Sequence, residues 1–219
     1  MIYTNGPVRG QFPPGCDFMP LDYRQAHFLL SAAEPSQLPV DEGAEVAFAG
    51  RSNAGKSSAL NAITDQRQLA RVSKTPGRTQ QINVFPILDT HRLIDLPGYG
   101  YAKAPAAMRT HWQKALPEYL ENRRSLRGLV LIMDIRHPLG PLDEQMVVWA
   151  AAAELPVHVL LNKADKLSRG AAGNTLQAVR PKVIAHCPGS SVQLFSAQTR
   201  QGVSDARTKL DEWLLGGLK

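Results

Sequence analysis

The chain has 219 residues, a formal net charge of +6 and a hydrophobic fraction of 43%, which suits one well-cored α/β domain and leaves little room for a second. No apolar run is long enough to span a bilayer, and the first residues lack the basic and apolar regions of a secretory signal. Two cysteines, Cys16 and Cys187, are too few and too far apart for a disulfide framework or a cysteine metal site. We therefore expect a cytoplasmic protein, and the positive charge favours an anionic partner.

The first 39 residues are predicted to precede the main domain, which we place at residues 40–219. Proline and glycine are frequent in residues 1–20, a composition that favours a loose arm. Apolar residues then recur at helical spacing between residues 22 and 33, so we expect a short helix that packs on the core.

Strands alternate with helices from residue 40 onward. Apolar runs predict strands at 46–49, 129–133, 157–161 and 192–195, and an antiparallel hairpin of 82–88 and 91–95. Helical spacing predicts helices at 56–64, 108–120, 142–153, 173–185 and 203–215. Pro86 is expected at a sheet edge, and Pro117 at a kink or break. The order favours an α/β fold with a doubly wound, mainly parallel six-stranded sheet, one antiparallel strand and helices on both faces.

A phosphate-binding loop is predicted at residues 50–58, directly after the first strand. The stretch fits G-x-x-x-x-G-K-[ST], in which Gly50 and Gly55 let consecutive N–H groups point at phosphate oxygens. Lys56 would place its ammonium on the terminal phosphates, and Ser57 would offer a hydroxyl to Mg²⁺. The alternative is a plain glycine turn, but strand, loop and helix follow in the order of a P-loop NTPase.

A second phosphate element is predicted at residues 95–98, where the sequence Asp-Leu-Pro-Gly closes a buried strand. This position places the Asp95 carboxylate beside the phosphate loop, at the carboxyl edge of the sheet. There it can hold Mg²⁺ through a water, while the Gly98 N–H reaches a γ-phosphate. Thr79 is the candidate for the second hydroxyl on Mg²⁺; Thr75 competes for that role, and either could be a plain turn residue.

The base is expected to be guanine, because residues 162–165 read Asn-Lys-Ala-Asp after another buried strand. The Asp165 carboxylate can accept both the N1–H and the 2-amino hydrogens of guanine, which adenine cannot offer. Asn162 can bond the other edge of the base, and the Lys163 stem can lie along its face. Ser196 and Ala197 follow the strand 192–195, where a backbone N–H could meet the guanine oxygen. The alternative for 162–165 is a simple helix cap.

Basic residues gather in two groups. Residues 66–88 contain no acid but four basic residues, namely Arg67, Arg71, Lys74 and Arg78. The second group comprises Arg109, Lys114, Arg123, Arg124 and Arg127. These groups either bind RNA or form an ordinary solvated surface that also faces the nucleotide's phosphates.

In this order the motifs resemble those of the translation-factor-like bacterial GTPases, and residues 50–58, 74–80, 95–103 and 162–167 look like the EngB/YihA family of GTP-binding proteins. The resemblance covers about residues 22–215. It implies a GTP-dependent factor in assembly of the large ribosomal subunit, also linked to septation and cell division. By position it implies Mg²⁺ on Ser57 and Thr79, beside Asp95, with Lys56, Thr79 and Gly98 acting in catalysis. The implied nucleotide contacts are Gly50, Arg51, Ser52, Asn53, Ala54, Gly55, Lys56, Ser57, Gly77, Arg78, Thr79, Gln80, Gln81, Asp95, Leu96, Pro97, Gly98, Asn162, Lys163, Ala164, Asp165, Phe195, Ser196 and Ala197.

Intrinsic hydrolysis is expected to be slow. Tyr99 stands where many GTPases have the glutamine that orients the attacking water. Asn53 resembles the asparagine with which related GTPases coordinate K⁺, so it either binds that cation or only stabilises the loop. The γ-phosphate and Mg²⁺ are expected to order residues 66–81 and 96–105 and to present basic side chains to ribosomal RNA.

Three classes of function follow. We favour a monomeric GTPase that acts on the large ribosomal subunit or its RNA. A non-enzymatic division scaffold that senses GTP is the second class, and co-sedimentation with ribosomal subunits separates it from the first. A P-loop kinase is the third, which tight GDP binding without ATP binding excludes.

Overall fold

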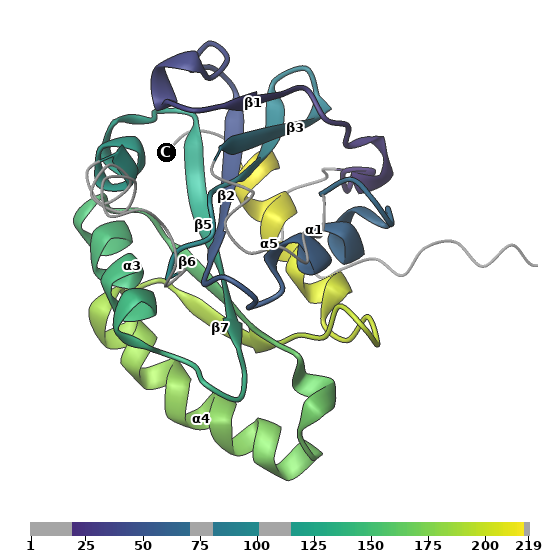
Figure 1. Ribbon diagram of the computed structural model, residues 1–219, viewed down its shortest axis with the longest axis vertical. Coiled ribbons are helices and arrows are strands. Elements are labelled where there is room, and N and C mark those ends of the chain that lie inside the picture. Colours follow the sequence, from purple (N-terminus) through teal and green to yellow (C-terminus); the bar gives the residue numbers. More distant parts are fainter. Residues whose placement is uncertain (1–18, 71–80, 101–114, 217–219) are drawn as a thin grey trace, which may run out of the picture.

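The computed structural model describes residues 19–70, 81–100 and 115–216, and all structural statements below refer to these ranges. They contain one seven-stranded sheet of order β1-β3-β4-β2-β5-β6-β7 (Figure 1). Its strands are β1 Leu30–Ala32, β2 Ala44–Gly50, β3 Ile82–Leu88, β4 His91–Asp95, β5 Leu126–Asp134, β6 Val157–Asn162 and β7 Ser191–Leu194. Strand β3 runs antiparallel to both its neighbours, and the remaining pairs are parallel. The doubly wound, mainly parallel sheet is confirmed, with seven strands in place of the six predicted.

Helices cover both faces of the sheet, with α1 and α5 on one side and α3 and α4 on the other (Figure 1). Their bounds are α1 Lys56–Thr64, α3 Pro141–Ala152, α4 Arg169–His186 and α5 Val203–Leu215, with short 3₁₀ turns at η1 Tyr23–Gln25, η2 Pro35–Gln37 and η3 Ala164–Lys166. Residues 115–122 are also helical, so the helix continues past Pro117. Within the described ranges, none of the helices has the length and apolar character that crossing a bilayer requires.

Two hydrophobic cores lie on either side of the sheet because strand side chains alternate in direction. In β5, Leu129, Leu131 and Met133 pack with α3 and α4. The intervening Val130 and Ile132 pack with α1 and α5. Such a double burial explains the nearly continuous apolar runs of the central strands.

The predicted helix at 22–33 is wrong. The segment forms only η1, an extended stretch and the edge strand β1, which pairs antiparallel with β3 from Leu30 opposite Val84 to Ala32 opposite Ile82. Ala26 is buried, but Leu29 is 48% exposed, so the apolar spacing does not define a buried helix face. Backbone bonding to an available sheet edge overrides the weak local pattern.

The predicted hairpin of β3 and β4 is confirmed, but Pro86 does not lie in an edge strand. The β1 pairing extends along β3 only from Ile82 to Val84, and beyond it the carbonyl of Pro86 accepts a 3.1 Å hydrogen bond from the His27 N–H. Proline is tolerated there because its missing N–H falls past the end of the β1 ladder.

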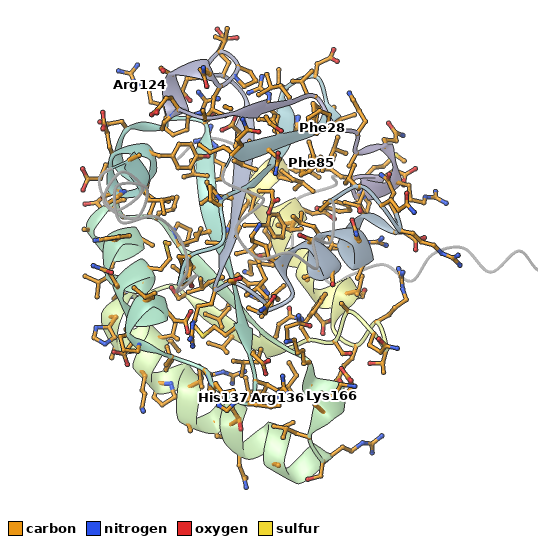
Figure 2. All side chains as sticks on the ribbon, in the orientation of Figure 1. Phe28, Phe85, Arg124, Arg136, His137 and Lys166 are labelled. Atoms are coloured by element: carbon orange, nitrogen blue, oxygen red, sulfur yellow. The ribbon has the colours of Figure 1, made fainter. Side chains whose placement is uncertain are left out.

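Part of the second basic group is not a free cationic surface. The Arg123 guanidinium lies 2.7 Å from the Glu45 carboxylate, which is fully buried and also pairs with Arg92 at 2.9 Å. This network lies where β2 begins, and Arg124 lies at the opposite end of the molecule from Lys166 (Figure 2). Arg123 therefore holds the amino end of the sheet together, contrary to the RNA-binding alternative; Arg109 and Lys114 lie outside the described residues.

Candidate functional site

Four of the predicted site segments lie at the carboxyl edge of the parallel strands. Residues 50–57, 95–98 and 162–165 begin at the last residues of β2, β4 and β6, and residues 195–197 follow β7. Ligands of open α/β sheets bind at this edge. The remaining predicted segment is divided: Gln81 is exposed just before β3, whereas Arg71, Lys74, Thr75, Gly77, Arg78, Thr79 and Gln80 lie outside the described residues.

The loop between β2 and α1 is shaped by two glycines that admit no side chain. Gly55 has φ +95°, and a Cβ there would lie 2.3 Å from Nδ2 of Asn162. A Cβ on Gly50 would lie 2.7 Å from the carbonyl oxygen of Ile132. Asn53, at φ +66°, is also left-handed, a conformation that asparagine adopts more readily than most residues. The backbone thus turns tightly into the N-terminus of α1, the geometry that suits bound phosphate.

Two charged groups are buried together beside this loop. The Lys56 ammonium forms an ion pair with Oδ1 of Asp95, and both side chains are less than a tenth exposed. Nδ2 of Asn83 donates a 3.2 Å hydrogen bond to the other carboxylate oxygen of Asp95. Ser57 follows Lys56 directly and is half-buried. The structure therefore brings together the predicted phosphate-binding cation and the predicted magnesium-binding carboxylate.

The segment 95–99 is bonded along its backbone to the phosphate loop. The Leu96 N–H donates to the Phe48 carbonyl at 3.0 Å, and the Tyr99 N–H donates to the Gly50 carbonyl at 3.3 Å. In return the Ser52 N–H donates to the Tyr99 carbonyl at 2.8 Å. Gly98 consequently lies against the loop, where an added Cβ would be 3.7 Å from the Gly50 carbonyl oxygen.

The Tyr99 side chain points from this segment to the first turn of α3. Its hydroxyl donates a 2.7 Å hydrogen bond to Oδ1 of Asp143. Burial, together with the nearby Asp143 charge, raises the pKa of Tyr99 well above its usual range, so the hydroxyl stays protonated. Sequence reasoning missed Asp143, since nothing in the helical pattern of 142–153 signals this partner.

Asp165, the residue predicted to read guanine, has an ionised carboxylate at this edge of the sheet. Its pKa is lowered chiefly by the Ser196 hydroxyl, which donates a 2.6 Å hydrogen bond, and next by the Lys166 ammonium 3.0 Å away. Ser196 is fully buried, and its oxygen also accepts the Thr199 N–H at 3.1 Å. The loop after β7 therefore holds Asp165 in position.

Asn162 braces two loops in the structure. Its Nδ2 donates a 2.9 Å hydrogen bond to the Ala54 carbonyl, and its Oδ1 accepts the Ala197 N–H at 3.4 Å. The residue is only 2% exposed. Both ends of the amide are thus engaged with the protein, which assigns Asn162 a positioning role beyond the base contact that the sequence suggested.

Lys163 connects the segment 162–165 to the phosphate loop. Its ammonium donates to the Asn53 carbonyl at 2.7 Å and lies 2.9 Å from Oδ2 of Asp134. Arg136, and to a lesser degree Lys163, holds the pKa of Asp134 well below its usual range. Arg136 lies at the same end of the molecule as Lys166 (Figure 2). Asp134 was missed, although it ends β5 as Asp95 ends β4, so the same rule could have found it.

A glycine-shaped loop that leads into α1, with a D-x-x-G segment bonded to it at the carboxyl edge of a parallel sheet, defines a P-loop nucleotide-binding protein. Residues 45–163 match the family model described as 50S ribosome-binding GTPase. Over 193 residues the chain is 58% identical to the "Probable GTP-binding protein EngB" of Salmonella paratyphi B, covering 88% of this chain and 92% of the relative. The relative of the same name from Salmonella typhimurium gives the same identity and coverage. The chain belongs to the EngB family of GTP-binding proteins, and it hydrolyses GTP.

Solved structures agree on the fold. The crystal structure of a probable GTP-binding protein engB has a TM-score of 0.65 at 21% identity and covers 80% of this chain and 100% of its own. Era in complex with MgGDPNP and nucleotides 1506–1542 of 16S ribosomal RNA has a TM-score of 0.61 at 22% identity, covering 81% of this chain and 59% of its own. With the family established, the kinase alternative is no longer supported.

Proposed function

We propose that this GTPase is a Mg²⁺-dependent switch that acts in assembly of the large ribosomal subunit. The convergence of the phosphate loop, Gly98 and Asp165 at one sheet edge is the observation that carries the proposal, because it joins γ-phosphate reading to guanine recognition. The family description as 50S ribosome-binding supports the choice of subunit.

We assign the nucleotide contacts to the predicted segments. Residues 50–57, with 77–81, are proposed to bind the phosphates, and Lys56 and Gly98 to contact the γ-phosphate. Asp165 is proposed to read guanine while the Lys163 stem covers one face of the base. The lowered pKa of Asp165 supports this role, since only the ionised carboxylate accepts both guanine N–H groups.

Magnesium is proposed to bind Ser57, Thr79 and Asp95. Hydroxyl and carboxylate oxygens suit this hard cation, and Asp95 lies beside the Lys56 ammonium, which is itself proposed to contact phosphate. When bound, Mg²⁺ would neutralise charge on the β- and γ-phosphate oxygens. Asp95 also has a fixed orientation, because Asn83 donates a hydrogen bond to its second oxygen.

Intrinsic hydrolysis is proposed to be slow because this chain offers no glutamine at the water-positioning place. The Tyr99 hydroxyl there is bound to Asp143. Lys56 would stabilise charge that develops on the transferred phosphoryl group, and the Gly98 N–H would hold one of its oxygens. Acceleration is proposed to come from a bound partner or from K⁺ held by the Asn53 side chain.

Ribosomal RNA is the proposed partner, and the cytoplasm the proposed site of action. Arg67, Arg71, Lys74 and Arg78 form a run without acidic neighbours in sequence that suits phosphate contacts. We extend to this chain the link to septation that the family resemblance implied.

The test is co-sedimentation of the full chain with purified large subunits, with small subunits as the matched control. We expect binding to large subunits with a non-hydrolysable GTP analogue, weaker binding with GDP, and an affinity that falls steeply with rising salt. Equal binding with both nucleotides, or binding to small subunits alone, would overturn the proposal.

A further inference from the structure

Tyr99 is bonded on both sides, and the two sides lead to different parts of the molecule. Its backbone exchanges hydrogen bonds with Gly50 and Ser52 of the phosphate loop, at 3.3 and 2.8 Å. Its hydroxyl reaches across to Asp143, in the first turn of α3, at 2.7 Å. A single residue thus connects the segment that carries Gly98 to a helix outside the nucleotide loops.

Asp143 is itself fixed. Its second oxygen accepts the Gly140 N–H at 3.0 Å, at the point where α3 begins, and the residue is 1% exposed. Burial raises its pKa, partly offset by the hydrogen bond from Tyr99. The Arg51 guanidinium lies next to Gly140, where an added Cβ would be 3.1 Å from Nη1 of Arg51. The positive charge of Arg51 favours the ionised form of Asp143 and lowers its pKa somewhat. The acceptor is therefore a carboxylate held in one place by the helix terminus.

We infer that the Tyr99–Asp143 hydrogen bond is a latch that holds the Gly98 amide against the phosphate loop, so that the state of the γ-phosphate is coupled to α3. Tyr99 and Asp143 are positioning residues in this scheme, since neither is assigned a contact with nucleotide. The inference rests on the proposed function, in which Gly98 reads the γ-phosphate.

The latch favours GTP over GDP for a physical reason. Only GTP offers a γ-phosphate to Gly98, so only GTP gains from an amide that is already in place. Without the latch, segment 95–99 can adopt other conformations. GTP binding must then restore the conformation that holds Gly98 against the loop, and this cost lowers the affinity for GTP. GDP makes no such contact, and its affinity is expected to change little.

The chain supplies a matched control in Tyr23. Its hydroxyl also donates a 2.7 Å hydrogen bond to a buried helical carboxylate, Asp211 of α5. Burial raises the pKa of Asp211 as it does that of Asp143. The Tyr23 pair joins η1 to α5 rather than the phosphate loop to α3, so it tests the loss of the same bond elsewhere.

The experiment compares affinities for a non-hydrolysable GTP analogue and for GDP in the wild type, Tyr99→Phe and Tyr23→Phe, with melting temperature measured alongside. We expect Tyr99→Phe to lower the ratio of GTP-analogue to GDP affinity about tenfold, the equilibrium effect of one hydrogen bond to a charged group. Tyr23→Phe should lower the melting temperature similarly and leave the ratio unchanged. Adding Asp143→Ala to Tyr99→Phe should lower the ratio no further.

The outcomes separate the latch from the function on which it rests. If the wild type discriminates but Tyr99→Phe keeps the same ratio, or if both phenylalanine variants change it equally, the latch is overturned and the GTP switch stands. If the wild type does not bind the GTP analogue at all, Gly98 has no γ-phosphate to contact, and both proposals fall.

Discussion

Replacing Asn162 with alanine tests how the phosphate loop and the loop after β7 are held together. The substitution removes the partner of the Ala54 carbonyl, bonded at 2.9 Å, and of the Ala197 N–H, bonded at 3.4 Å. Each buried backbone group left without a partner costs about 1–3 kcal/mol, and the longer bond belongs at the low end. We therefore expect a total loss of about 2–4 kcal/mol, divided between folding stability and nucleotide affinity.

The assay combines denaturant unfolding of the protein without nucleotide with calorimetric binding of GDP and of guanosine. If Asn162 braces the phosphate loop, Asn162→Ala loses at least tenfold in GDP affinity and much less in guanosine affinity. A residue that only touched the base would weaken both ligands equally. Asn174→Ala, an exposed asparagine of α4, is the control and should change neither quantity. Wild-type GDP affinity in Asn162→Ala would refute the bracing role.

Three further predictions concern other parts of the chain. Gly55→Ala should abolish GDP binding and lower the free energy of unfolding by about 1–3 kcal/mol, because φ is +95° and the new Cβ would clash with Asn162. A GDP-binding assay checks the first effect, and thermal unfolding checks the second. Burial lowers the pKa of His158 from 6.5 to about 4. As the pH falls from 6.5 towards 4, the unfolded chain therefore binds a proton at His158 that the folded protein does not, and the free energy of unfolding decreases. The free energy of unfolding should be about 2 kcal/mol lower at pH 5 than at pH 8 because of His158 alone. His158→Gln should remove this difference, whereas His186→Gln, at an exposed position, should retain it. Asn53→Gly keeps the left-handed backbone but removes the side chain. If GTP hydrolysis by this variant no longer prefers K⁺ over Na⁺, Asn53 binds the cation. If the preference is unchanged, Asn53 serves only to hold the conformation of the loop.

The sequence predicted the elements whose signals are local. The phosphate loop has a fixed spacing, and helix α1 was expected at the bounds that the structure gives. The apolar runs of β5 and β6 identified buried strands, and parallel pairing then placed the segments after β4 and β6 at one edge. Topology supplied what a linear pattern lacks, because the carboxyl ends of parallel strands meet.

The features that were missed depend on partners distant in sequence. The spacing in 22–33 suggested a helix, but the β3 edge offered Leu30–Ala32 backbone bonds that no local pattern reveals. The sequence does not distinguish a surface role of Arg123 from its ion pair with Glu45, which lies 78 positions away in the chain. The bond from Tyr99 to Asp143 spans 44 positions and carries no motif. Side-chain contacts of this kind come from the packing of whole elements, so they require the structure.

The most direct test of the account is nucleotide selection by Asp165. We expect the wild type to bind GDP and to reject ADP by at least about 10⁴-fold, because adenine leaves the carboxylate unpaired. Asp165→Asn should lose about 10²–10⁴-fold in GDP affinity, the effect of two hydrogen bonds to a charged acceptor, and should gain affinity for xanthosine diphosphate, whose 2-oxo group accepts from the new amide. Recovery with xanthosine diphosphate also shows that the variant is folded. Equal binding of ADP and GDP by the wild type, or unchanged GDP affinity in Asp165→Asn, would contradict guanine recognition by Asp165.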